Sequence, residues 1–160
     1  MVWLLVISTA VFIISCKKKT SDPVVDCTNA AYIDSVAKLN IATIHQYASD
    51  SSLTIDSTTT GLYYSIIDSG VGANPTTSSY LTVKYKGYTT NGLVFDQTTT
   101  TASFYLSNLI YGWQYGLPLI KKSGKIKLII PARLGYGCNA VGSIPPNSVI
   151  IFDVELIDFR

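Results

Sequence analysis

The sequence has few of the residue types that bind metal ions or act as nucleophiles in hydrolases. Its 160 residues include one histidine, His45, and three cysteines that lie far apart along the chain. A structural zinc site needs four such ligands, so we expect no metal and no cofactor. A Ser-His-Asp triad would depend on His45, which falls beside Ile44 in a predicted helix, where we expect a surface or packing role.

The sequence also lacks a strong charge of either sign. Charged residues make up 14% of the chain and the net charge is +2, which is too small to indicate nucleic-acid binding. The letters of a dinucleotide-binding turn occur at Gly135–Ala140, but the residues that follow begin no helix, so we assign them no such function. With 48% hydrophobic residues and no internal repeat, the chain fits one modest globular domain.

The apolar stretch at the N-terminus is too short to cross a membrane as a helix. Val2–Ile14 has thirteen residues, whereas a hydrocarbon core of about 30 Å needs about twenty. The stretch fits the central region of a secretory signal. Ile13-Ile14-Ser15-Cys16 resembles a bacterial lipobox, although no Lys or Arg precedes the stretch. A buried strand or helix that ends in a core cysteine is the alternative.

A lipobox would define the N-terminal region. We expect a signal peptide at residues 1–15, lipidation of Cys16, and a polar tether at residues 16–28. The protein would then be attached to the membrane of the bacterial cell envelope by a lipid anchor, facing the periplasm or the cell surface.

The cysteine count agrees with this division. Three cysteines are an odd number for a secreted chain, but if Cys16 is lipidated, Cys27 and Cys138 remain as a pair. An envelope compartment permits a disulfide between them. Two unpaired thiols are the alternative.

Residues 29–60 are predicted to form a helical arm and a linker. Apolar residues recur at helical spacing at Ile33, Val36, Ala37, Ile41, Ile44 and Tyr47. We expect a helix over Asn29–Ala48 that lies apart from the strands, as an accessory arm or as the contact surface of a homodimer. Ser49–Thr60 is rich in serine and threonine, which is typical of a linker.

From Gly61 to Arg160 the pattern is that of β-strands. Leu81, Val83 and Tyr85 alternate with polar residues. In the last segment one set alternates with another: Ile150, Phe152, Val154 and Leu156 with Ile151, Asp153, Glu155 and Ile157. Both patterns predict strands with one buried face. Several antiparallel strands with one short helix indicate an α+β fold in which a sheet wraps around the helix.

Aromatic and aliphatic side chains form the remaining candidate site. Tyr136 stands between two glycines and Ile144 precedes two prolines, and residues in such loops often bind ligands. The motifs VKYKG, GLVFD, LIYGW, GYG and IPPNSVIIFDVELID follow one another in this order within residues 61–160. In sequence and spacing they resemble the FKBP-type peptidyl-prolyl cis-trans isomerases.

The resemblance implies a fold and a site for residues 61–160. The fold is a five- or six-stranded antiparallel sheet wrapped around a short helix. The catalytic residues that it implies are Tyr85, Phe95, Asp96, Tyr136 and Phe152. The substrate-binding residues that it implies are Leu109, Ile110, Trp113 and Ile144. Many members of the family have phenylalanine where this chain has Ala102.

The activity that the resemblance implies is isomerisation of X-Pro peptide bonds, which would speed the folding of exported proteins. A pocket floored by Trp113 would desolvate the prolyl amide and favour its twisted form. The Tyr136 hydroxyl and the Ile110 N–H would hold substrate carbonyls. Proline-containing polypeptides are the expected partners. The alternative, which Ala102 favours, is a binding module without turnover or a holdase chaperone that acts through the N-terminal helix.

Overall fold

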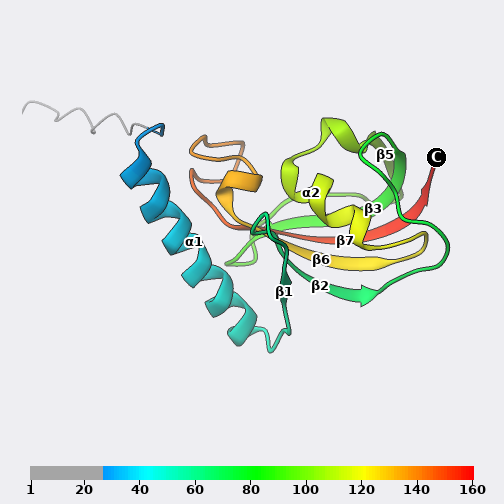
Figure 1. Cartoon of the computed structure of the whole chain (residues 1–160), viewed down its shortest axis with the longest axis horizontal. Helices are drawn as coiled ribbons and strands as arrows, with labels where there is room; N and C mark the ends of the chain where they lie inside the picture. Colours follow the sequence, from blue (N-terminus) through cyan, green and yellow to red (C-terminus); the bar gives the residue numbers. More distant parts are fainter. Residues whose placement is uncertain (1–26) are drawn as a thin grey trace, which may run out of the picture.

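The computed structural model describes residues 27–160, which form a long helix, a short helix and an antiparallel sheet (Figure 1). The long helix, α1, spans Ala30–Asp50. The strands are β1 (Asp56–Ser57), β2 (Tyr63–Asp68), β3 (Tyr80–Thr89), β4 (Val94–Gln97), β5 (Ala102–Tyr105), β6 (Lys125–Ile130) and β7 (Ile150–Phe159). They lie in the order β1-β2-β6-β7-β3-β4, and β5 also pairs with β3.

The predicted α+β fold is confirmed, with one difference in the number of strands. The described part of the chain has seven strands because β1 pairs with β2. The sequence predicted a linker at this point. A two-residue strand leaves no alternation to detect, so only the pairing with β2 reveals it.

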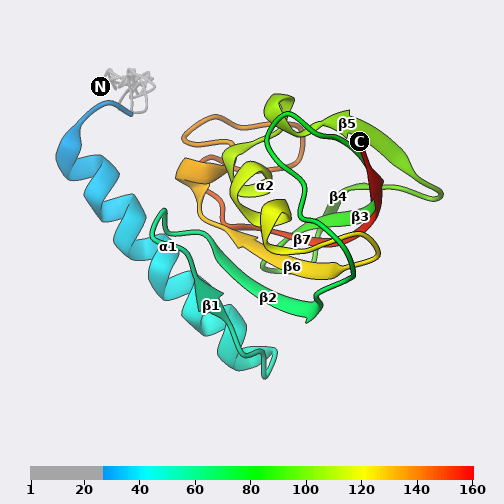
Figure 2. The same cartoon turned by 45° about the vertical axis from the view of Figure 1, so that its right-hand side comes forward.

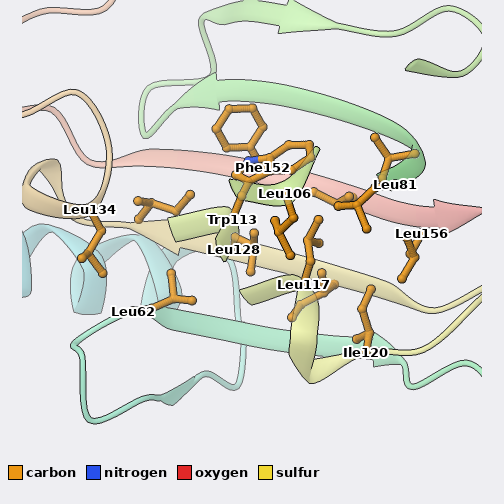
Figure 3. Close-up of a cluster of buried hydrophobic side chains, with 14 of the residues drawn as sticks. Leu62, Leu81, Leu106, Trp113, Leu117, Ile120, Leu128, Leu134, Phe152 and Leu156 are labelled. Atoms are coloured by element: carbon orange, nitrogen blue, oxygen red, sulfur yellow. The ribbon is translucent and has the colours of Figure 1, made fainter. Parts of the chain in front are cut away.

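One face of the sheet packs against the short helix α2 (Tyr111–Gly116) and the 3-10 turn Leu117–Leu119 that follows it. Gly112 and Gly116 allow the close approach, because a Cβ at either residue would lie 2.6 Å from Ile130 or 2.4 Å from Leu128 on β6. The main core lies between helix and sheet, and its buried leucines surround Trp113 and Phe152 (Figure 3).

The other face of the sheet packs against α1, so the prediction of an arm that lies apart from the strands is wrong. Ile44 of α1 is fully buried in a second cluster with Ile129, Val149 and Ile151. The prediction of one buried face for β7 fails for the same reason: Ile151 points to α1 while Phe152 points to α2. Helix α1 lies at the opposite end of the domain from β5 (Figures 1 and 2).

A polar cluster joins the end of α1 to three strands. The Lys127 ammonium donates to the Tyr88 hydroxyl at 2.5 Å and also to Asp153. The Tyr88 hydroxyl donates to the other Asp153 oxygen at 3.1 Å. The Tyr47 hydroxyl on α1 lies 3.3 Å from the Tyr88 hydroxyl. These contacts help to hold α1 against the back of the sheet.

Within residues 27–160, no helix is both long and apolar enough to span a bilayer. The predicted signal peptide, the lipidation of Cys16 and most of the tether lie outside the described residues.

Candidate active site

Four aromatic rings from four different elements meet between α2 and the sheet. They are Tyr85 on β3, Phe95 on β4, Trp113 on α2 and Phe152 on β7, and we call them the aromatic cluster. The Trp113 ring lies edge-on to Phe152 and Tyr85, with centroids 5.2 and 5.4 Å apart. Phe95 meets Phe152 edge-on at 5.4 Å. Edge-to-face contacts at these distances stabilise the rings beyond their burial alone.

A missing side chain on β3 makes room for two of these rings. Gly87 pairs with Phe152 across the β3–β7 ladder and with Asp96 across the β3–β4 ladder. A Cβ at Gly87 would lie 2.6 Å from the rings of both Phe152 and Phe95. Gly87, the glycine of the VKYKG motif, therefore lets the rings of Phe95 and Phe152 pack directly against the β3 backbone.

The aromatic cluster has a buried base and a partly exposed side. Trp113 and Phe152 are each 4% exposed, whereas Tyr85 and Phe95 are partly exposed. Four of the residues that the resemblance assigns to the pocket are thus in contact, and the open pocket itself stays a prediction. A cavity of about 500 Å³ lies elsewhere, between α1 and the segment after β6.

Asp96 orients one phenol at the exposed side. The Tyr85 hydroxyl donates to Asp96 Oδ2 at 2.7 Å. Burial, this hydrogen bond and the negative charge of Asp96 together raise the pKa of Tyr85 to about 12. Tyr85 is therefore a neutral donor at physiological pH, and its O–H stays hydrogen-bonded to the carboxylate.

Tyr136 lies near the same carboxylate. Its half-buried ring packs against the main core. Burial, and to a smaller extent the Asp96 charge, raises the pKa of Tyr136. Ionisation of Tyr136 would further raise the pKa of Tyr85. At physiological pH, two neutral phenols and one carboxylate therefore share this side of the aromatic cluster.

The predicted substrate-binding residues differ in exposure. Leu109 and Ile110 are partly buried against the core, and Ile110 is the N-cap of α2, with an extended backbone. Among the described residues, the Ile110 N–H is not a donor in any of the backbone hydrogen bonds of turns, loops and helix caps. Ile144, expected to bind substrate from the loop before β7, is only 4% exposed and belongs to the core.

Sequence reasoning missed Phe104. Its ring centroid lies 6.2 Å from that of Tyr85, on the same face of β5 as Ala102, since both are partly buried while Ser103 and Tyr105 are exposed. The alternation in β5 could have revealed it. Phe104 thus supplies aromatic surface beside Ala102.

Two other candidates lie away from the aromatic cluster. His45 is exposed and meets Tyr63 edge-on at 5.6 Å, which is a packing contact. Cys27 and Cys138 form a disulfide with a Cα–Cα distance of 6.2 Å. Among residues 27–160, no three His, Cys, Asp or Glu side chains are grouped so as to hold a metal ion.

The site is therefore suited to an apolar, uncharged substrate. Its described residues offer aromatic surface, two phenol groups, one carboxylate already bound to a phenol, and a backbone N–H at the start of α2. A site of this kind can desolvate a group, orient it and donate hydrogen bonds to it.

Comparison with known proteins agrees with the resemblance of the motifs. The family model for FKBP-type peptidyl-prolyl cis-trans isomerase matches residues 72–157. The chain is 45% identical over 109 residues to the FKBP-type peptidyl-prolyl cis-trans isomerase FkpA of Escherichia coli strain K12, an alignment that covers 66% of this chain and 40% of that protein. The chain thus spans about two fifths of that relative's length.

Solved structures give the same result for the fold. The crystal structure of FkpA from Escherichia coli matches with a TM-score of 0.69 and 39% identity, covering 81% of this chain and 63% of that one. A peptidyl-prolyl cis-trans isomerase from Pseudomonas syringae pv. tomato matches with a TM-score of 0.70 and 25% identity, covering 79% and 95% of the two chains.

Proposed function

Because the chain belongs to the FKBP-type peptidyl-prolyl cis-trans isomerase family, we propose that it isomerises X-Pro peptide bonds at the aromatic cluster. The observation that carries the proposal is the contact of Trp113, buried at the base, with the rings of Tyr85 and Phe152. A proline ring would bind against the partly exposed side of these residues.

The mechanism follows from the nature of the amide bond. Rotation about an X-Pro bond has a barrier of about 18–20 kcal/mol, because resonance gives the C–N bond partial double-bond character. Twisting removes that resonance and makes the amide less polar. A water-poor aromatic surface therefore binds the twisted amide better than the planar one, and this difference in binding accelerates rotation. No nucleophile and no proton transfer are needed.

The polar groups of the site orient the substrate. The Tyr136 hydroxyl donates to a substrate carbonyl, and the Ile110 N–H holds the neighbouring one. Asp96 keeps the Tyr85 phenol in place through their hydrogen bond. Leu109 and Ile144 add apolar wall, the latter from the core side.

A proline-isomerisation assay on an Ala-X-Pro peptide tests the proposal. Wild type should accelerate the reaction over buffer, and Phe95→Ala and Tyr136→Phe should reduce kcat/KM. Tyr105→Phe is the matched control, because Tyr105 is 55% exposed and is not in contact with the aromatic cluster. Equal rates for wild type and buffer would refute the enzymatic function.

Ala102 favours a second candidate function, a module that binds proline-containing segments, or a holdase, without turnover. It removes one aromatic wall that many family members have, although Phe104 lies on the same face. Titration of Trp113 fluorescence with the same peptide, with Trp113→Phe as the blank, separates the two functions. Binding without acceleration would support the module.

The cellular role is part of the proposal. The N-terminal signal and lipobox pattern support a lipid-anchored envelope protein that assists the folding of exported proteins, and the Cys27–Cys138 disulfide is compatible with that compartment. Mass analysis of the mature N-terminus tests this, since an intact Met1 without an acyl group would refute it. The homodimer through α1 stays a prediction that light scattering can test.

A further inference from the structure

A buried asparagine on α1 binds both ends of the segment that carries Tyr136. Asn40 is 4% exposed. Its Oδ1 accepts the backbone N–H of Ala132 at 2.8 Å, and its Nδ2 donates to the backbone carbonyl of Asn147 at 3.0 Å. One side chain of α1 therefore fixes the chain before and after Tyr136.

Ala132, which Asn40 holds through its N–H, also binds the immediate neighbours of Tyr136 through its carbonyl. The Ala132 carbonyl accepts the N–H groups of the two glycines that flank Tyr136, at 3.0 and 2.8 Å. The second of these, Gly137, accepts the N–H of Asn147 at 2.8 Å through its own carbonyl. Asn40, Ala132, Gly137 and Asn147 thus form a closed ring of hydrogen bonds, and Tyr136 is directly attached to it.

Asn40 lies where α1 borders a cavity. The cavity of about 500 Å³ separates much of the helix from the segment. Two further side-chain links lie nearer the start of α1, where the Asn147 amide donates to the Tyr32 hydroxyl and Cys27 is bonded to Cys138. Asn40 is therefore a buried link between α1 and this segment.

We propose that Asn40 is a positioning residue that sets the place of Tyr136 from the opposite side of the sheet, an inference that rests on the proposed function. Loss of its side chain would leave the Ala132 N–H, which is buried, without its acceptor. The segment would shift to solvate that group, and the Tyr136 hydroxyl would move relative to Asp96. On this view α1 supports the site.

Asn40→Ala and Asn40→Asp test the proposal, with Ile44→Ala as the control. Ile44 lies one turn further along α1, is fully buried, and contacts the sheet. At a temperature where all variants are folded, Asn40→Ala should lower kcat/KM roughly 10-fold, equivalent to the loss of about one buried hydrogen bond. Ile44→Ala should lower the melting temperature and leave kcat/KM within about twofold of wild type.

A double-mutant cycle separates positioning from a general loss of structure. If Asn40 acts through the Tyr136 hydroxyl, Asn40→Ala should reduce kcat/KM by less than about twofold in a Tyr136→Phe background. Multiplication of the two single effects would overturn the proposal, as would wild-type activity in a folded Asn40→Ala. Should Asn40→Ala not fold, Asn40→Asp replaces it in the cycle, since it keeps the acceptor for Ala132 and loses the donor to Asn147.

A measurement without turnover keeps this proposal distinct from the proposed function. The ring resonance of Tyr136 is identified by its absence in Tyr136→Phe. Its chemical shift can be followed by NMR as a function of pH, in variants that keep Tyr85 and Asp96. Asn40→Ala should bring the raised pKa of Tyr136 back toward its ordinary value, and Ile44→Ala should not. An unchanged pKa would overturn the positioning role, whereas failure of wild type in the isomerisation assay would overturn only the enzymatic function.

Discussion

The packing around Gly87 makes a sharp prediction for Gly87→Ala. The added methyl would lie 2.6 Å from Phe152 Cε1 and 2.6 Å from Phe95 Cε2, whereas carbon atoms in contact are normally about 3.5–4.0 Å apart. Each distance is therefore about 1 Å too short. Phe152 cannot easily yield, because it is buried and lies against Trp113 at 5.2 Å. Phe95 is partly exposed, so we expect Phe95 to move outward.

The magnitude follows from the two contacts. Insertion of one methyl group into a packed core typically costs about 1–3 kcal/mol of unfolding free energy. Because Phe95 can move toward solvent, we expect the lower half of that range. The effect on the proposed isomerase activity should be of similar size, since the displaced ring belongs to the site: kcat/KM should fall roughly 10-fold, about 1.4 kcal/mol, close to the effect of Phe95→Ala.

Urea unfolding and the peptide isomerisation assay measure the two effects. Leu156→Val is the stability control, because Leu156 is fully buried on β7 but is not in the aromatic cluster, and the loss of one methylene there costs about 1 kcal/mol. In a Phe95→Ala background, Gly87→Ala should cost less activity than it does in wild type. Wild-type kcat/KM in a folded Gly87→Ala would refute the reasoning that this glycine keeps the rings in place.

Three further predictions concern stability. The pKa of Tyr85 is raised to about 12 from 10.0, so the folded state holds this proton more tightly than the unfolded state does. The stability advantage of wild type over Tyr85→Phe should therefore be constant below about pH 10 and shrink between about pH 10 and 12. Urea unfolding that shows no such decline contradicts this. Cys27→Ser should lower the free energy of unfolding by about 2–4 kcal/mol, because the disulfide closes a loop with a sequence separation of 111 residues; equal melting temperatures with and without reductant contradict it. Lys127→Met should lower the free energy of unfolding by about 1–3 kcal/mol, since it removes the cation bound to Tyr88 and Asp153. Lys122→Met breaks an exposed pair with Asp158 and should lower it by less than about 1 kcal/mol. Equal losses in a thermal melt would show that burial of the first pair does not matter.

The longer strands were predictable because their signal is local, unlike that of β1. In β3 the burial of Leu81 and Val83 follows the alternation in the sequence. The helix signal of α1 was local too, and its expected range differs from Ala30–Asp50 by one or two residues at the ends. Motif order identified the family, because several short matches in register are far more specific than one.

The contacts of α1 could not be predicted, because they join residues far apart in the chain. The sequence separations from Asn40 to Ala132 and Asn147 are 92 and 107 residues. An asparagine in the middle of a helix suggests exposure when its partners are unknown. The burial of Ile151 was missed for the same reason, since the far face of a sheet is covered only if another element docks there.

The position of β7 has a consequence for how the chain acquires its fold during synthesis. This strand lies between β3 and β6 and pairs with both along most of its length, yet both partners precede it in the chain. Until β7 emerges, the two partner strands have no common neighbour and leave open edges that can associate with other chains. Before β7 has paired, the chain is therefore more prone to associate with other chains than the finished sheet is.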